Sequence, residues 1–129
     1  MSTRSFIGYA DENGDIHAIY CHYDGYLEGV GFTLVDHYRK FDKVRKLVSL
    51  GAIDSLHPNL SRGEHTITFD RDLGNECGRK IGDLLSTHLF NTERKYTEYA
   101  YEHNAEYVYL FKDNKWHYNE WENKEFRPI

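Results

Sequence analysis

The sequence predicts an α+β fold with a mostly antiparallel sheet, and three observations support this prediction. Runs of β-branched and aromatic residues at both ends of the chain each flank a short turn, which is typical of a β-hairpin. An alternating run near the middle predicts one further strand, and stretches between these runs carry apolar residues at helical spacing. This order of elements favours three to four helices packed on one side of the sheet.

The N-terminal hairpin is predicted over residues 5–9 and 16–23, around the Asn13-Gly14 pair. An Asn-Gly pair suits the positive φ angles of a tight hairpin turn. Alternation in the second strand puts Ile16, Ala18, Tyr20 and His22 on one face and His17, Ile19, Cys21 and Tyr23 on the other. Because both faces carry apolar residues, we expect this strand to be central and covered on both sides.

Two helices are expected after this hairpin. Apolar residues recur at helical spacing at Val30, Leu34, Val35 and Tyr38, and the next short helix spans residues 42–50. Asp42 is the expected N-cap of this second helix, and Gly51 is its expected C-terminal stop. Residues 52–63 contain Pro58 and Asn59 and are predicted to be a loop.

The second half of the chain is predicted to hold a strand, two helices and a hairpin. Residues 66–70 alternate as a strand, and a glycine-containing helix is expected from Cys77 to His88. Asn91 or Thr92 is the expected cap of a helix that ends at His103. Residues 106–112 and 115–121 are predicted to pair around a two-residue turn. We expect the charged tail, residues 122–129, to be loosely ordered.

Composition indicates one acidic domain over residues 1–129. Its formal charge of −5 disfavours a nucleic-acid partner, because the phosphate backbone needs a basic surface. Cys21 and Cys77 are far apart and form no CxxC pair, which favours a reducing compartment. No apolar run approaches the roughly twenty residues of a membrane-spanning helix. We therefore expect a cytoplasmic protein that does not act at a membrane.

The segment Cys-His-Tyr-Asp-Gly-Tyr at positions 21–26 concentrates the most chemistry in the chain. In an enzyme, His22 would be a general base oriented by Asp24, and Cys21 would be the nucleophile. Strand alternation points Cys21 and His22 to opposite faces, which argues against this triad and leaves His22 and Asp24 as the catalytic candidates. The favoured alternative is structural, with Cys21 buried and Asp24 capping the turn at Gly25.

A small-ligand pocket at this corner is the second hypothesis. Its candidate residues are Arg4, His22, Asp24, Tyr26 and Arg71. The Gly29-Val30-Gly31 run lacks the lysine of a phosphate-binding loop, so close packing explains these glycines more simply than nucleotide binding does. None of the eight histidines forms an HxxxH pair, and we expect neither a bound metal nor a cofactor.

Several motifs resemble those of a family of small phage and prophage proteins of unassigned function. They are the MSTRSxIG start, the AIYCHxDGY run at residues 18–26, and the Arg71-Asp72-x-Gly74 turn. The closing residues 106–113, from Glu106 to Asp113, are also similar, so the resemblance covers nearly the whole chain. It implies a phage or mobile-element setting and carries no activity with it.

Aromatic residues of the last helix and hairpin are the candidate binding surface, since aromatic anchors are enriched at protein interfaces. The candidates are Tyr101, Tyr107, Tyr109, Trp116, Tyr118 and Trp121. The leading hypothesis is therefore a small phage-type protein that binds a host or phage protein, with counter-defence inhibition of the anti-CRISPR kind as one form. The alternative is a small-ligand or nucleotide-processing protein with its pocket at the 21–26 corner.

Overall fold

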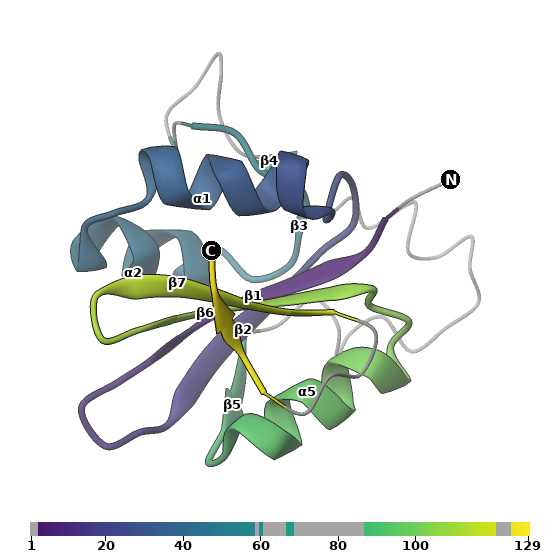
Figure 1. Ribbon diagram of the computed structural model, residues 1–129. Coiled ribbons are helices and arrows are strands. Elements are labelled where there is room, and N and C mark those ends of the chain that lie inside the picture. The colour runs from purple at the N-terminus through teal and green to yellow at the C-terminus, as the bar shows by residue number, and fades with distance from the viewer. Residues whose placement is uncertain (1–2, 59, 61–66, 69–86, 121–124) are drawn as a thin grey trace.

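The computed structural model describes residues 3–58, 60, 67–68, 87–120 and 125–129. Its centre is a mixed sheet in which the neighbouring strands run in the order β4-β3-β2-β1-β6-β7-β8, with β5 also paired to β2 (Figure 1). Most pairings are antiparallel, but β1 pairs with β6, and β2 with β3, in parallel. The predicted α+β class is confirmed.

The two predicted hairpins form the middle of this sheet. β1 (Ser5–Ala10) pairs with β2 (Ile16–Cys21), and β6 (Tyr107–Lys112) pairs with β7 (Lys115–Glu120). Both turn residues Asp113 and Asn114 have positive φ, as a two-residue hairpin turn requires. The two hairpins join along their first strands, β1 and β6, which pair in parallel.

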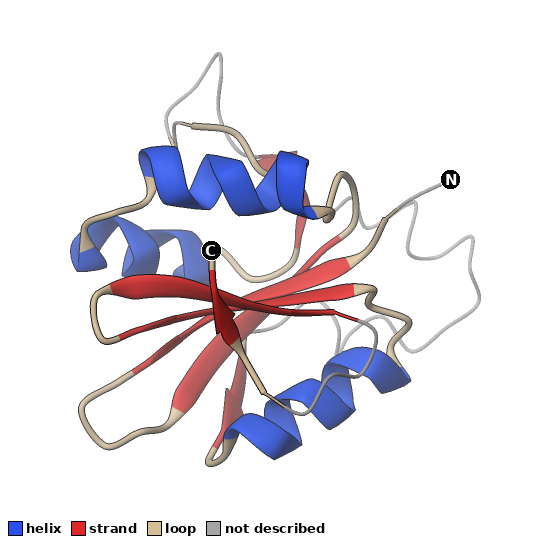
Figure 2. Cartoon of the chain, in the orientation of Figure 1, coloured by secondary structure: helices blue, strands red, loops and turns tan. Residues whose placement is uncertain are grey.

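The prediction that the helices pack on one side of the sheet is wrong. The π-helical turn η1 (Leu27–Gly31), α1 (Phe32–His37) and α2 (Phe41–Ser49) cover one face, and α5 (Glu93–Glu102) covers the other (Figure 2). Two buried clusters result, one under α1 and α2 and one under α5. The reason is the apolar alternation on both sides of the central strands, which one helical layer cannot cover.

Local sequence signals predict the ends of α2 and α5 to within one or two residues of the observed ends. α2 is capped by the backbone of Lys40 rather than by the side chain of Asp42, which lies in the first turn, and Gly51 follows the helix with φ +78°. The Thr92 side chain accepts from the N–H of Lys95 and caps α5, as expected. Within the described residues, no helix has the length and apolar character needed to cross a membrane.

Three expectations about strands need correction. The predicted loop after α2 contains β3 (Ile53–Ser55), and His88 belongs to β5 (His88–Phe90) rather than to a helix. The C-terminal tail forms β8 (Arg127–Pro128) along β7. Each of these strands has only two or three residues, too few for a periodic pattern, and β3 and β5 gain backbone hydrogen bonds from β2, which is distant in sequence. The middle strand is observed as β4 (Ile67–Thr68), while the helix predicted from Cys77 lies outside the described residues except at Thr87 and His88, neither of which is helical.

Candidate functional site

The 21–26 corner begins where β2 ends. The backbone N–H groups of His22 and Tyr23 donate to the carbonyls of Ile53 and Asp54 at 3.0 and 2.8 Å, which continues the pairing with β3. Asp24 then adopts a left-handed conformation with φ 57°, and the chain reverses. A short polar residue tolerates this conformation better than most others do. The corner is therefore held by backbone contacts before any side chain takes part.

Close packing explains the glycines of this corner. A Cβ atom on Gly25 would lie 2.7 Å from the Cβ of Ser5, and one on Gly29 would lie 2.4 Å from the carbonyl oxygen of Asp24. A Cβ on Gly31 would lie 3.2 Å from the ring of Tyr109. At Gly25 and Gly29 a Cβ would be too close to backbone atoms for the chain to stay in place, whereas at Gly31 the side chains of Leu27 and Tyr109 would have to move.

Tyr109 ties the corner to the sheet. Its hydroxyl donates a 2.7 Å hydrogen bond to the carbonyl of Gly25, and the side chain is fully buried. Burial raises the pKa of the Tyr109 hydroxyl well above its ordinary value, so the group stays a neutral donor. This bond joins residues 84 positions apart and makes the corner part of the core.

Cys21 and His22 point to opposite faces of the sheet, as alternation predicts. Cys21 is completely buried with the cluster under α1 and α2, and burial raises its pKa to about 12. A thiol with that pKa is protonated at neutral pH and is a poor nucleophile. These observations agree with Cys21 as a buried core residue and do not support the triad.

The predicted pair of His22 and Asp24 does not form. The Nδ1 atom of His22 shares a 2.7 Å hydrogen bond with the hydroxyl of Tyr20, whereas Asp24 accepts a long, 3.4 Å bond from Tyr26. Within the described residues, Asp24 and His22 share no hydrogen bond. The turn explains this, because the left-handed Asp24 breaks the alternation that would have put both side chains on one face.

The remaining ligand-site candidates are Arg4 and Arg71. Arg4 lies close enough to His22 for its charge to act on the imidazole, as does Asp54 from β3. Arg4 forms no ion pair within the described part of the chain, and Arg71, like Asp72, lies outside it. Among the described residues, no group of three or more His, Cys, Asp or Glu side chains is arranged to hold a metal ion.

We predict that His22 makes stability rise with pH near neutrality. Burial, together with the charge of Arg4, lowers the pKa of His22 below its ordinary value of 6.5, and Asp54 opposes this shift. The unfolded chain therefore binds more protons than the folded chain as the pH falls through about 6.5, and the stability decreases over that interval. Urea unfolding at a series of pH values should show this slope, and His22→Gln should flatten it. An unchanged slope in the variant would contradict the assignment.

The structure separates the aromatic residues that were predicted to form one binding surface. Tyr109 and Trp116, proposed as interface residues, are instead core residues with exposures of 0% and 5%. Their strand face lies under α1, where the indole of Trp116 donates to the carbonyl of Tyr38 at 2.8 Å. Tyr101 lies on the opposite side of the sheet, on α5, and donates to Asn119. Trp121 lies outside the described residues.

Tyr107 and Tyr118 remain at the surface on the side of α1, half-buried. Tyr107 faces Glu120 across the β6–β7 pair, and Tyr118 is opposite Tyr109. Burial raises the pKa of the Tyr107 hydroxyl, and the charges of Glu120, Glu28 and Glu106 raise it further. We refer to Glu28, Tyr107, Tyr118 and Glu120 as the acidic tyrosine face.

The alternation of the hairpin predicts part of this face, because it puts Tyr107, Tyr118 and Glu120 on one side of the sheet. The sequence gives no such signal for Glu28, because Glu28 comes near Tyr107 only when η1 packs over the hairpin.

Comparison of the chain with protein-family models, with curated proteins and with solved structures gives no match.

Proposed function

We propose that this chain is a small phage-type protein that binds a host protein through its acidic tyrosine face. The observation that carries the proposal is the placement of Tyr107 among three carboxylates, those of Glu120, Glu28 and Glu106. Tyrosine supplies a large apolar ring with a polar tip, which is the composition enriched at protein interfaces. The carboxylates add the charge that a basic partner surface would match.

The neighbouring helix extends this surface. Phe32 follows Glu28 by four positions, at the start of α1, and is 47% exposed. Tyr26, just before η1, is 39% exposed. Exposed aromatic rings beside carboxylates suit a partner segment that alternates basic and apolar side chains. The phage setting comes from the sequence resemblance, the counter-defence role is proposed from that setting alone, and the binding chemistry comes from this face.

We expect charge reversal on this face to abolish partner binding. Glu28→Lys combined with Glu120→Lys places two positive charges around Tyr107, where a basic partner would be repelled. The tagged chain is expressed in bacterial cells, and co-purifying proteins are identified and quantified. The unaltered chain should retain one stoichiometric partner, and the double variant should lose it.

The matched control is Glu12→Lys combined with Glu102→Lys. It makes the same change in net charge at exposed positions in the first hairpin turn and at the end of α5. This control should retain the partner in full. Absence of any stoichiometric partner, or equal loss in both double variants, would count against the proposal.

A further inference from the structure

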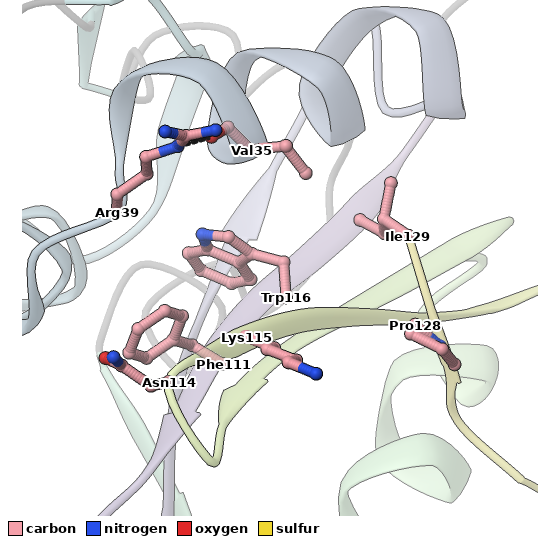
Figure 3. Close-up of a pocket in the computed structure, with 8 residues that line it drawn as sticks. All are labelled: Val35, Arg39, Phe111, Asn114, Lys115, Trp116, Pro128 and Ile129. Carbon is pink, nitrogen blue, oxygen red and sulfur yellow. Dashed lines mark hydrogen bonds between the residues drawn. The ribbon is translucent and has the colours of Figure 1, made fainter.

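A pocket of about 350 Å³ opens between the end of α1 and the C-terminal hairpin, and of the residues predicted from the sequence as a site it includes only Trp116 (Figure 3). Its apolar lining consists of Val35, Phe111, Trp116, Pro128 and Ile129. Three separate parts of the chain supply these residues, namely α1, the β6–β7 hairpin and the C-terminal segment. The pocket falls within the size range of small-molecule sites.

The lining is pre-formed by backbone contacts. The N–H of Ile129 donates to the carbonyl of Trp116 at 3.2 Å, which fixes the C-terminal wall against β7. The indole N–H of Trp116 is already used by the carbonyl of Tyr38, so the indole contributes apolar surface and no free donor to the pocket. Phe111 packs against Trp116 with ring centroids 5.1 Å apart. A ligand would thus meet a wall that does not need to rearrange.

The polar lining is cationic although the chain as a whole is acidic. Arg39 and Lys115 line the pocket together with Asn114, and no acidic side chain among the described residues does so. The Nε atom of Arg39 donates to the carbonyl of Val35 at 3.0 Å, which orients the guanidinium at the end of α1. Within the described residues, the two terminal nitrogens of Arg39 and the ammonium of Lys115 have no hydrogen-bond or ion-pair partner.

We propose that this pocket binds a small organic carboxylate with an aromatic or branched aliphatic body. The body would rest against Trp116 and Ile129, and the carboxylate would accept hydrogen bonds from the guanidinium of Arg39, while Lys115 adds positive charge on the other side of Trp116 (Figure 3). A guanidinium offers two parallel donors that match the geometry of a carboxylate, and an ammonium adds a second positive charge. The inference is independent of the proposed protein partner, because it uses none of the residues of the acidic tyrosine face.

The test uses 3-phenylpropionate as the probe and 3-phenylpropanamide as its neutral counterpart. Each is titrated into the isotope-labelled full chain, and the amide and indole resonances are followed by heteronuclear NMR. The carboxylate should give saturable shifts at Lys115, Trp116 and Ile129. The amide should bind about tenfold more weakly, because it lacks the charge that the two cations recognise.

The variant Arg39→Gln combined with Lys115→Gln should weaken carboxylate binding by about tenfold or more, while binding of the neutral amide should change little. Lys46→Gln combined with Lys95→Gln is the matched control, since it removes the same charge from exposed positions on α2 and α5. The control should bind as the unaltered chain does. The proposal is overturned by absence of saturable shifts at the pocket, by equal affinity for the two probes, or by unchanged binding in the Arg39 and Lys115 variant.

Discussion

Replacing Tyr109 with alanine is expected to lower the free energy of unfolding by about 3–5 kcal/mol, because the change removes a buried aromatic ring and leaves a cavity. The ring is fully buried, and it packs where η1 crosses the sheet, next to Gly31. The variant also leaves the carbonyl of Gly25 without its donor. Urea unfolding followed by circular dichroism measures the loss.

Tyr109→Phe separates the hydroxyl from the ring. Phenylalanine keeps the packing and removes only the 2.7 Å hydrogen bond to Gly25, so the expected loss is about 1–3 kcal/mol. Tyr107→Ala is the matched control, two residues earlier on the same strand and face, where the ring is only half-buried. It should cost clearly less than Tyr109→Ala. Equal losses at the two positions would show that the corner is not held by Tyr109.

Gly29→Ala has the next largest expected effect, a loss of about 2–3 kcal/mol in the free energy of unfolding from overpacking. Helix propensity alone predicts the opposite sign, because alanine in a helical turn is favoured over glycine by about 1 kcal/mol. The new Cβ would lie 2.4 Å from the carbonyl oxygen of Asp24. That oxygen also accepts from the N–H of Val30 at 2.9 Å, so it cannot move without loss of the bond.

Gly14→Ala is the control for this prediction. Gly14 has φ +83°, and a Cβ there would meet nothing within 4 Å, so the variant tests backbone strain without a steric contact. We expect a loss of about 1–2 kcal/mol, the ordinary cost of an L-residue in the left-handed conformation. If Gly29→Ala unfolds at the same urea concentration as the unaltered chain, or at a higher one, the predicted overlap of the new Cβ with the carbonyl oxygen of Asp24 is wrong.

These variants bear on function because the corner underlies the acidic tyrosine face. η1 carries Glu28 and is held to the hairpin by the contacts of Gly31 and Tyr109. A loosened corner would let Glu28 move away from Tyr107. Charge reversal at Glu28 and Glu120, by contrast, should change binding while the free energy of unfolding stays nearly constant, since exchanges of surface side chains usually alter it little.

Local sequence signals were sufficient for both hairpins and for most helix ends. Asp11 illustrates why: its side chain accepts from the N–H groups of Asn13 and Asp15, so the turn is held by residues within four positions. Thr92 and Gly51 likewise act on the helix that each one borders. The alternation of β2 also predicted that Cys21 would be buried away from His22, and the structure confirms this.

Which tyrosines face the solvent could not be predicted from the hairpin alone. Tyr107, Tyr109 and Tyr118 share one strand face, and Trp116 shares it too. Alternation shows only that these four residues share a face, not which part of it is covered. The packing of η1 and α1 over the middle of the face buries Tyr109 and Trp116 and leaves Tyr107 and Tyr118 near its edge.

The sequence by itself determined the α+β class, the two hairpins, the Thr92 cap of α5, the end of α2 at Gly51 and the separation of Cys21 from His22, because each depends on residues close together in the chain. Only the tertiary structure decided the parallel junction of β1 with β6, the placement of α5 on the opposite face, and the short strands β3, β5 and β8. It also brought Glu28 near Tyr107, and it lined one pocket with both Arg39 and Lys115. Apart from the β7–β8 pair, these contacts join residues tens of positions apart. They form because apolar faces must be buried against one another, which no local pattern specifies.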